Sequence, residues 1–491
     1  MASQDVDPSG LGYGVSGSGI ITAGEYDLQV AKIVASTGLE TDISLSIMSL
    51  TIYEDIREFA LIGEIMIQDS VNLASMAPLI GQEYLKLKIA TPTIKNKEYI
   101  IDFTENPFMI TTVDSREDTA NGTQQTILSF VSREFVVNQR KKVTRTLTGS
   151  YDKIVWQIVS TDLESKKRYY WEPSAENKKF VAPNESPFTI INNSMRHAVS
   201  KKYQDPTFLF YESLRGFNFR TIGNLYAQPP VMKYEGAIEG TKTKKGIPDI
   251  IKDYNSILNY TISGAPDTVY NYLEGMYASE LLVHNITSKN YQKHTYNYIK
   301  SFDNERHIEV GPLVNTLSIT KDGENVSNFP SKTFLAPVSS MGTGHSIDSS
   351  FVDRFNFQPY TSSTPERHIQ QRNSNLGMLE TGLSVNVYVH GHTTMVCGDV
   401  VECNIPYTAG IKTEKNEKHD NLYKGSFLIV KIRHDFNFLN KKYNMGLQLA
   451  KDSVPEQIVA PSNNPEPTAE KEGARYEDMW VEMAGGINNV Q

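Results

Sequence analysis

The chain has 491 residues and a formal net charge of −9, with 39% hydrophobic and 21% charged residues. This balance is typical of globular proteins, and the length predicts roughly three domains. An acidic chain lacks the surplus of Lys and Arg that binds nucleic-acid phosphates or an anionic membrane surface. Two cysteines exclude a disulfide scaffold. Because there is neither a signal-peptide pattern nor an apolar run of about 18 residues, we expect no membrane insertion and folding in the cytoplasm.

Both ends of the chain have a polar composition. Residues 1–24 contain GYGVSG at 12–17, which matches the glycine pattern of dinucleotide-binding loops. Such a loop follows a strand, whereas a tail with Ser, Asp and Pro precedes this one, so we predict a flexible N-terminal arm. Residues 453–491 have the composition of a linker and tail. Their apolar segment ARYEDMWVEM either docks on a partner or frays.

Residues 25–145 alternate between apolar and polar positions, as strands with one buried face do. A hairpin is predicted within 107–134, with Asn121-Gly122 in its turn. About six short strands with one-sided burial predict a small closed β-barrel or a sandwich, and we assign the block to a first β-barrel. The side chains predicted to face its core are Ile43, Leu45, Ile47, Leu85, Leu87 and Ile89.

The next block, 146–255, is predicted to be a mixed α/β domain. Residues 151–163 and the segment after Pro187 have the apolar spacing of helices, and 208–226 has the composition of strands. Met195 is assigned to the core of this domain rather than to a ligand site.

Strand patterns return at 256–300 and at 376–452, which together are predicted to form a second β-barrel. The polar residues 301–375 between them are predicted to be an insertion. The predicted fold class is therefore mainly β with an α+β middle domain, and it contains two similar small β-barrels per chain plus inserted domains.

The two β blocks share a layout that indicates an internal duplication. In the first, Gly81 leads a strand that is followed by FMITTV from Phe108, a polar turn and QQTILSF. In the second, Gly398 leads a strand that is followed by FLIVKI from Phe427, a polar turn and KKYNMGLQL. The glycine and the phenylalanine are 27 residues apart in the first block and 29 in the second. Each copy therefore supplies the same glycine-led strand and the same terminal hairpin.

The stretch LSVNVYVHGHTTMVCGDVVECNIPY, residues 383–407, permits two interpretations. It contains His390, His392, Cys397 and Cys403, whose atoms are common zinc ligands. Structural zinc sites usually use close pairs such as Cys-x2-Cys, which this spacing does not provide. Alternating apolar residues predict instead a half-buried strand, a turn, and a second strand with Cys403 in its core face. We therefore favour a hairpin over a metal site.

The sequence has no G-x-S-x-G, H-E-x-x-H or P-loop motif. Glu54, Asp55 and Glu58 resemble paired carboxylates for glycoside cleavage, but they lie beside Arg57 in a strand and loop where solvated charge is expected. His284, His294 and His307 are scattered through Tyr-rich β segments, and their spacing is not that of a metal site. We predict no catalytic residue, no metal site and no cofactor.

Several segments resemble the baseplate hub proteins of contractile-tailed bacteriophages, and together they extend over most of 25–452. They are ISLSIMSLTIYEDIREFALIGEIMIQDS, PLIGQEYLKLKI, LSFVSREFVVNQRKKVTRTLTG, FNFRTIGNLY and CGDVVECNIPY. Many relatives have Pro before the Gly-Asp of the last segment, where this chain has Cys397. The two tails and 301–375 have no counterpart in the family.

The resemblance implies a structural virion protein of the tail baseplate, related to the hub portion of type VI secretion spikes. Family hubs are homotrimers in which each chain gives two similar barrels to a ring of six. Such a ring adapts the six-fold tail tube, or its initiator proteins, to the three-fold central spike, with baseplate wedge proteins as further neighbours. Its channel allows transient DNA passage without specific binding, and the particle is assembled in the host cytoplasm.

Two other functions stay open at this point. Tyr291, Tyr296 and Tyr298 form a Tyr-rich cluster of the kind that stacks sugars, which would suit a β-rich glycan- or receptor-binding tail protein. A peptidoglycan hydrolase at a tail tip is the other alternative, although in hub assemblies lytic activity is expected on a separate spike chain.

Overall fold

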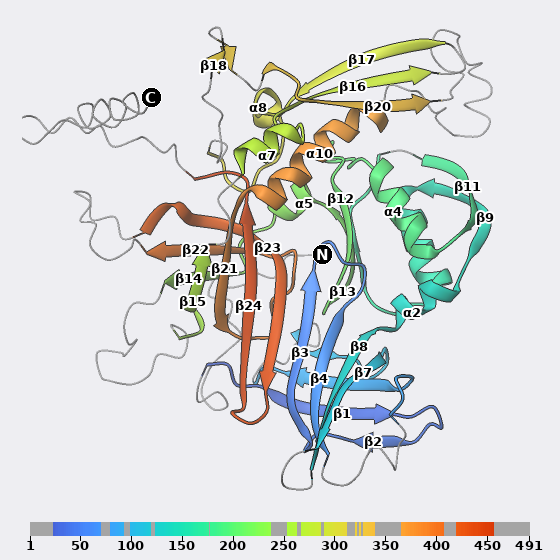
Figure 1. Cartoon of the computed structure of the whole chain (residues 1–491), viewed down its shortest axis with the longest axis vertical. Coiled ribbons are helices and arrows are strands. Elements are labelled where there is room, and N and C mark those ends of the chain that lie inside the picture. Colours follow the sequence, from blue (N-terminus) through green and yellow to red (C-terminus); the bar gives the residue numbers. More distant parts are fainter. Residues whose placement is uncertain are drawn as a thin grey trace, which may run out of the picture. The chain divides into compact units, whose positions relative to one another are not determined.

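The computed structural model describes residues 23–455 except for the gaps 70–78, 93–98, 119–122, 176, 237–252, 263–266, 286–288, 312–319, 322–323, 326–327, 339–364 and 407–418. Three predicted features lie outside the described residues: the N-terminal arm up to residue 22, the Asn121-Gly122 turn and the segment ARYEDMWVEM. Within this part the fold is mainly β, as predicted (Figure 1). None of the helices described is both long and apolar enough to cross a membrane.

The first barrel is built from strands that follow one another in the sequence. They are β1 (Asp27–Val34), β2 (Glu40–Asp42), β3 (Ile47–Asp55), β4 (Ile62–Asp69), β5 (Tyr84–Ala90), β6 (Ile101–Asp102), β7 (Phe108–Asp118) and β8 (Gln124–Ser132). The hydrogen-bonded order is β1-β5-β7-β8-β4-β3, with β6 attached to β5. The ring closes because β2 pairs with β1 and the chain continues from β2 through 43–46 into β3. The predicted core residues Leu85, Leu87 and Ile89 are fully buried.

The connection between β2 and β3 corrects one predicted strand. Residues 43–46 form a turn in which the Ser46 amide donates to the Ile43 carbonyl at 2.8 Å. Ile43 and Ile47 are buried as predicted, but Leu45 is fully exposed. The alternating residues therefore form a bend between two strands instead of one straight strand, because the turn directs the side chain of Leu45 outward.

The second barrel takes its strands from distant parts of the chain. They are β14 (Met232–Gly236), β15 (Ser256–Ile262), β21 (Leu383–His390), β22 (Val400–Pro406), β23 (His419–Asn437) and β24 (Lys442–Lys451). Their order is β14-β22-β23-β24-β21-β15, and β15 pairs with β14, so six strands form a closed ring. The first of them, β14, comes from the block predicted to be the mixed domain, so the assignment of all barrel strands to 256–300 and 376–452 is wrong for this strand.

Both barrels have the same strand order, which confirms that the chain contains two similar barrels. We number the six strands of each barrel along the chain, count β2 and β3 as one bent strand, and leave β6 out. In both barrels the strands then follow one another around the ring in the order first, fourth, fifth, sixth, third, second. The one difference in direction lies in the first strand. β1 is antiparallel to both neighbours, whereas β14 is parallel to both.

The register of the paired strands agrees as well. In the first barrel Leu85 of the fourth strand lies opposite Phe108 of the fifth, and in the second Val401 lies opposite Phe427. These are the phenylalanines that the sequence predicts to be equivalent. The fifth strand then has a bulge before its pairing with the sixth continues, at residue 111 in one copy and at residue 430 in the other. Shared bulges and shared register are expected of copies of one structure, because a bulge re-aims every later side chain.

The two barrels are joined edge to edge. Residues 431–437 of β23 pair antiparallel with 49–55 of β3. One antiparallel sheet of eight strands therefore runs through both barrels in the order β7-β8-β4-β3-β23-β24-β21-β15 (Figure 1). One face of this sheet packs into the barrel cores, and the opposite face is turned away from them.

The mixed domain has its own apolar core. Its elements are α2 (Arg133–Arg140), β9 (Val143–Ser150), α3 (Tyr151–Gln157), the π-helical turn η2 (Ile158–Asp162), β10 (Tyr169–Trp171), β11 (Asn177–Glu185), α4 (Pro187–His197), β12 (Phe208–Ser213), β13 (Gly216–Thr221) and α5 (Ile222–Tyr226). Both predicted helices are confirmed, and Met195 is buried in the core as predicted. Residues 222–226, predicted to be strand, form a helix because the Thr221 hydroxyl accepts the Asn224 amide and caps it.

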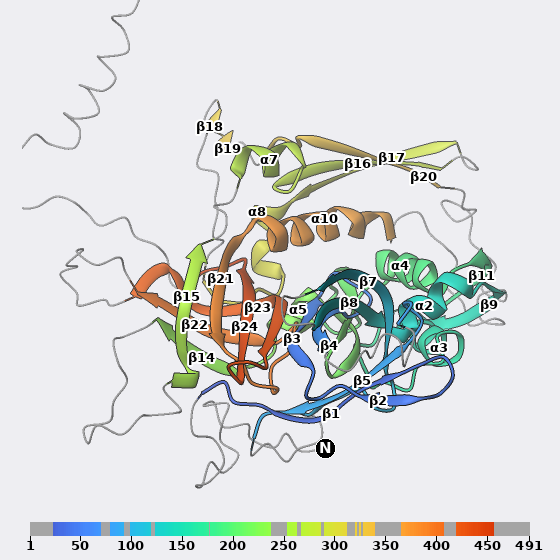
Figure 2. The ribbon, with the colours of Figure 1, turned by 60° about the horizontal axis from the view of Figure 1, so that its bottom comes forward.

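A third β structure lies between β15 and β21 in the sequence. It comprises α7 (Thr268–Leu273), β16 (Ala278–Asn285), β17 (Asn290–Asn297), α8 (Tyr298–Ser301), η3 (Phe302–Asn304), β18 (Thr320–Lys321), β19 (Glu324–Asn325), β20 (Lys332–Val338) and α10 (Pro365–Thr381). β16 and β17 are strands, as predicted for 256–300, and they pair with each other. β20 completes their sheet, so they are not strands of the second barrel. The physical reason is that α10 packs against β16 and β17, and the inward face of β16 is buried at Leu281 and Val283 (Figure 2).

Candidate functional site: the junction of the two barrels

The seam between the barrels contains a buried carboxylate. Glu54 of β3 is 2% exposed, and its Oε1 lies 2.8 Å from Nε2 of the fully buried His434 on β23. Its Oε2 accepts the backbone amide of Cys397 at 3.0 Å. Nδ1 of His434 lies 2.7 Å from the hydroxyl of Tyr443, so every polar atom of the pair has a partner. A buried charge is tolerated only when it is paired and hydrogen-bonded in this way.

This arrangement corrects the expectation that Glu54 is a solvated charge. The three acids considered for glycoside cleavage have different surroundings. Glu54 points into the junction, Asp55 on the other face of β3 pairs with Lys431 at 2.8 Å, and Glu58 is exposed in the following loop. Neighbouring residues of a strand point to opposite faces, so Glu54 and Asp55 cannot act on one bond.

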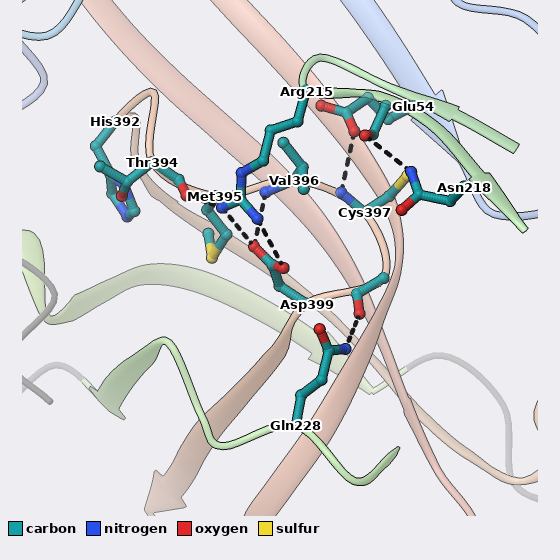
Figure 3. A network of polar contacts seen from close by, with 12 residues as sticks. Glu54, Arg215, Asn218, Gln228, His392, Thr394, Met395, Val396, Cys397 and Asp399 are labelled. Carbon is teal, nitrogen blue, oxygen red and sulfur yellow. Dashed lines mark hydrogen bonds and ion pairs between the residues drawn. The ribbon is translucent and has the colours of Figure 1, made fainter. Parts of the chain in front are cut away.

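A hairpin of the mixed domain reaches the same junction. Arg215, between β12 and β13, binds Asp399 with both guanidinium ends at 3.2 and 3.0 Å, and it also donates to the Thr394 carbonyl (Figure 3). Burial lowers the pKa of Arg215, but the Asp399 carboxylate more than offsets this, so the pKa lies above its usual value. Gln228 donates to the Gly398 carbonyl at 2.8 Å. The mixed domain is thus held to the turn that precedes β22.

That turn has an equivalent in the first barrel. Gly398 has a φ of +86° and Gly81 a φ of +89°, values that favour glycine. The acid that follows closes each turn. Asp399 accepts the Val396 amide at 3.2 Å, and Glu83 accepts three amides of its own turn between 2.9 and 3.0 Å. Among the described residues, an arginine of the mixed domain binds Asp399 and none binds Glu83, so the two equivalent turns have different roles.

The mixed domain is fastened to the first barrel by a second buried ionic group. Lys167 lies 2.7 Å from Glu134 and 2.6 Å from Glu212, and the three side chains are almost completely buried. Glu212 also accepts the amide of Leu61, which precedes β4, at 3.2 Å. Burial raises the pKa of Glu212. Sequence reasoning missed this group and Arg215, because the partners are far apart in the chain and no local pattern marks them.

The histidines and cysteines of 383–407 lie in the second barrel. His392 donates to or accepts from Thr394 at 2.6 Å, and burial lowers its pKa to about 4, so its imidazole is neutral. Cys403 is a core residue of β22, and burial raises its pKa to about 12. Cys397 lies in the turn, as predicted, and His390 ends β21. In the described part of the chain no three His, Cys, Asp or Glu residues are grouped to hold a metal ion.

The two strands of this stretch are confirmed, but the hairpin is wrong. β21 pairs with β15 and β24, while β22 pairs with β14 and β23. β23 and β24 therefore lie between them, and residues 391–399 cross the end of the barrel. The predicted core residues of β21 are nevertheless buried as expected: Leu383, Val385, Val387 and Val389.

The three tyrosines considered for sugar stacking do not form a common surface. Tyr298 is 1% exposed and packs inside, and the hydroxyl of Tyr296 donates to Glu305 at 2.6 Å. Tyr291 alone among them is largely exposed. A stacking platform needs neighbouring exposed rings, so this arrangement gives no support to a glycan site at these residues.

Comparison with solved structures finds proteins of phage tails and of type VI secretion. The tail protein from Neisseria meningitidis MC58 is 12% identical over 88% of this chain and 100% of its own, with a TM-score of 0.48. The 43 kDa tail protein of prophage MuSo2 from Shewanella oneidensis is 6% identical over 87% of this chain and 98% of its own, with a TM-score of 0.48. The E. coli c3393 protein, a component of the type VI secretion system, is 7% identical over 87% and 77%, with a TM-score of 0.40. No protein-family model and no curated protein matches the sequence.

Proposed function

We propose that the chain is a structural protein of a phage tail, a homotrimeric baseplate hub whose six barrels form a ring. The observation that carries this proposal is the identical strand order of the two barrels. A symmetric trimer meets a six-fold partner with equivalent contacts only if each subunit presents two like surfaces. Three copies of a chain with two such barrels provide six.

In this role the ring joins a six-fold tail tube, or its initiator, to a three-fold central spike, and wedge proteins surround it. The protein acts in the virion without enzymatic activity and is assembled in the host cytoplasm. Two barrels that differ in their inserted domains suit a place between a six-fold and a three-fold partner. The common strands would meet the six-fold partner, and the parts present once per chain would meet the three-fold spike.

The polar face of the eight-stranded sheet supports a channel for DNA. Two of its cations are paired with acids: Lys431 lies 2.8 Å from Asp55, and Arg433 lies 2.8 Å from Asp435. Glu64 on β4 adds an exposed carboxylate. A wall whose positive charges are neutralised does not retain phosphates, because such binding depends on the release of counterions by Lys and Arg. DNA would therefore pass without specific binding.

Native mass measurement of the purified full-length chain tests the proposal. Three chains of 55.2 kDa give 165.6 kDa, and averaged top views should show six lobes around a hole. An obligate trimer of this kind is expected to bury roughly 2,000–5,000 Å² per interface, so it should persist at low micromolar concentration. A monomer at every concentration, also with a central spike protein present, would overturn the proposal.

A further inference from the structure

A cavity of about 370 Å³ lies where three parts of the chain meet. Its first wall comes from the connection between β3 and β4 of the first barrel, at residues 56–59. The second comes from α4 and β12 of the mixed domain, and the third from α10 and from α7 with the residues that follow it (Figure 1). Ligand sites are commonly cavities of this size at a boundary between structural units. The position and the size of the cavity are therefore those of a ligand site.

The lining is mainly apolar and contains rings and thioethers. Among its large side chains are Phe59, Met195, Phe210, Tyr270 and Met276. Phe59 and Phe210 already pack edge to face, with ring centroids 5.4 Å apart. Thioethers adapt to irregular shapes and attract aromatic rings, and aromatic rings favour edge-to-face contacts with a further ring. The lining therefore suits an aromatic group.

One polar group of the lining lacks a partner. Asn271 of α7 is 2% exposed, and its amide nitrogen Nδ2 donates no hydrogen bond to any described residue. Asn373 and Thr381 also line the cavity, but they donate to the carbonyls of Glu274 at 3.3 Å and Gly377 at 2.8 Å. Buried donors are normally satisfied, and an exception calls for an acceptor that the chain itself does not supply. The missing group is an oxygen.

Apolar side chains continue outside the cavity along α7. Tyr270 belongs to the lining and is 55% exposed, and Leu273 on the same helix is 62% exposed. Val269 adds a third large side chain that is 69% exposed. Residues three or four apart on a helix are neighbours, so Val269, Tyr270 and Leu273 form one apolar surface. A small molecule inside the cavity would leave this surface uncovered, whereas a protein segment would cover it.

The acids of the lining are neutralised. Glu380 lies 3.2 Å from Arg57, and Glu274 pairs with Lys332. With their charges compensated in this way, these acids favour neither a basic nor an acidic partner, and an uncharged apolar segment matches them.

We propose that the cavity and the adjoining surface of α7 bind an uncharged segment of a partner protein that inserts an aromatic side chain with an oxygen, as tyrosine has. The ring would pack against Met195, Met276 and the lining aromatics, and its oxygen would accept a hydrogen bond from Asn271. A turn of the amide about the Cβ–Cγ bond, a soft torsion in asparagine, would direct Nδ2 to the ligand. Apolar residues beside the inserted one would cover Leu273. The site is built by one chain and does not require the trimeric ring.

Side-chain probes test the cavity in the full-length protein. Saturation-transfer NMR titrations would compare p-cresol, the side chain of tyrosine, with toluene, the side chain of phenylalanine. One buried hydrogen bond should give p-cresol an affinity about fivefold higher. Asn271→Leu should stay folded, because it removes an unpaired buried donor, and it should bind both probes equally.

Asn375 supplies the matched control for this comparison. It lies on α10 outside the lining, and its amide already donates to Glu305 at 2.7 Å. Asn375→Leu should therefore keep the preference for p-cresol. A preference that survives in Asn271→Leu, or that is also lost in Asn375→Leu, would overturn the role of Asn271.

A peptide probe tests the source of the aromatic group. The tripeptide acetyl-Leu-Tyr-Leu-amide should bind more tightly than p-cresol, because its leucines cover α7. Leu273→Ser should weaken the peptide about fivefold through lost apolar contact and leave p-cresol unchanged. Equal affinities of peptide and p-cresol would assign the cavity to a free aromatic molecule and overturn the partner segment. Absence of saturable binding of every probe would overturn the site, and the trimer, measured by its mass, would be unaffected.

Discussion

The two barrels have one topology but differ in how their strands are distributed along the chain. The strands of the first all lie within residues 27 to 132. The second begins at residue 232, ends at 451, and carries the third β structure between β15 and β21. Loops and insertions change more readily than a ring of paired strands, because the register fixes every core side chain. The common ring is therefore the geometric unit that the two barrels share, and the insertions distinguish them.

The two barrels also differ in how they hold the mixed domain. The first does so through Glu212, which accepts the Leu61 amide and belongs to the buried group of Lys167 and Glu134, and the second through Asp399, which binds Arg215. The lysine group is the more deeply buried. Removal of a charge from a buried group leaves its partners unpaired, which is more damaging than the loss of an exposed pair. This difference sets the order of the expected effects.

The largest effect is expected for Lys167→Met, which leaves two buried carboxylates without a cation. We expect a loss of about 3–5 kcal/mol in the free energy of unfolding, measured by urea denaturation. Arg215→Met should lose less, about 2–3 kcal/mol, because Arg215 remains partly accessible and Asp399 keeps a backbone partner. The exposed neighbour Lys166→Met is the control and should change stability by less than about 0.5 kcal/mol. Equal losses of stability in Lys166→Met and Lys167→Met would refute the conclusion that Lys167 stabilises the fold by pairing with Glu134 and Glu212.

The next effect is a histidine-dependent loss of stability at low pH that is expected in the second barrel and not in the first. Residues 25–145 contain no histidine, whereas His392 is buried in the second barrel with a pKa lowered to about 4. Burial disfavours the charged ring, and His434 and Arg215 add repulsion. The unfolded chain therefore binds the proton first, and the stability present above pH 6.5 is lost as the pH falls toward 4, by up to about 3 kcal/mol.

Hydrogen exchange at pH 4.5 checks where this loss occurs. Peptides from β21 and β24 should exchange faster than at pH 7 after correction for intrinsic rates, while peptides from β5 and β8 stay protected. His392→Gln keeps a polar side chain of similar length but does not titrate, so it should flatten the acid slope of the unfolding curve. A slope that is unchanged in this variant would assign the pH dependence to other groups.

A smaller effect compares the two glycine turns. Gly81→Ala and Gly398→Ala each force a side chain into a left-handed backbone conformation, which costs about 1–3 kcal/mol. The loss should be greater at Gly398, because a Cβ there overlaps the hydroxyl of Tyr211, whereas at Gly81 it meets a backbone oxygen at 2.8 Å. Tyr211→Phe removes that hydroxyl and should restore part of the stability of Gly398→Ala in thermal unfolding. No restoration would mean that backbone strain alone sets the loss.

The duplication shows what the sequence can predict and where it fails. The fourth to sixth strands of both barrels were predictable, because a glycine before the fourth strand, alternating apolar residues and a phenylalanine in the fifth strand mark them in each copy. The first two strands of the second barrel were not. β14 has only five residues, and a segment of 120 residues separates β15 from the strand it pairs with, β21. A local sequence pattern does not indicate which distant strand will be the pairing partner.

The junction was hidden from the sequence for the same reason. Glu54 has the appearance of a surface acid in a strand, and its partner His434 is 380 residues away. Burial of a charge depends on a partner supplied by tertiary structure, so the charge of this side chain predicts the opposite of what is found. The turn glycines were the better guide, because their backbone requirement is local.

The smallest expected effect concerns the strand joint between the two barrels. Thr51→Val removes the hydrogen bond that the Thr51 hydroxyl donates to Asp435, and it should lower the free energy of unfolding by about 1 kcal/mol in urea denaturation. Thr261→Val, at an exposed position of β15, is the matched control and should change the free energy of unfolding by less than about 0.5 kcal/mol. Equal losses in the two variants would mean that the hydrogen bond across the joint does not contribute to stability.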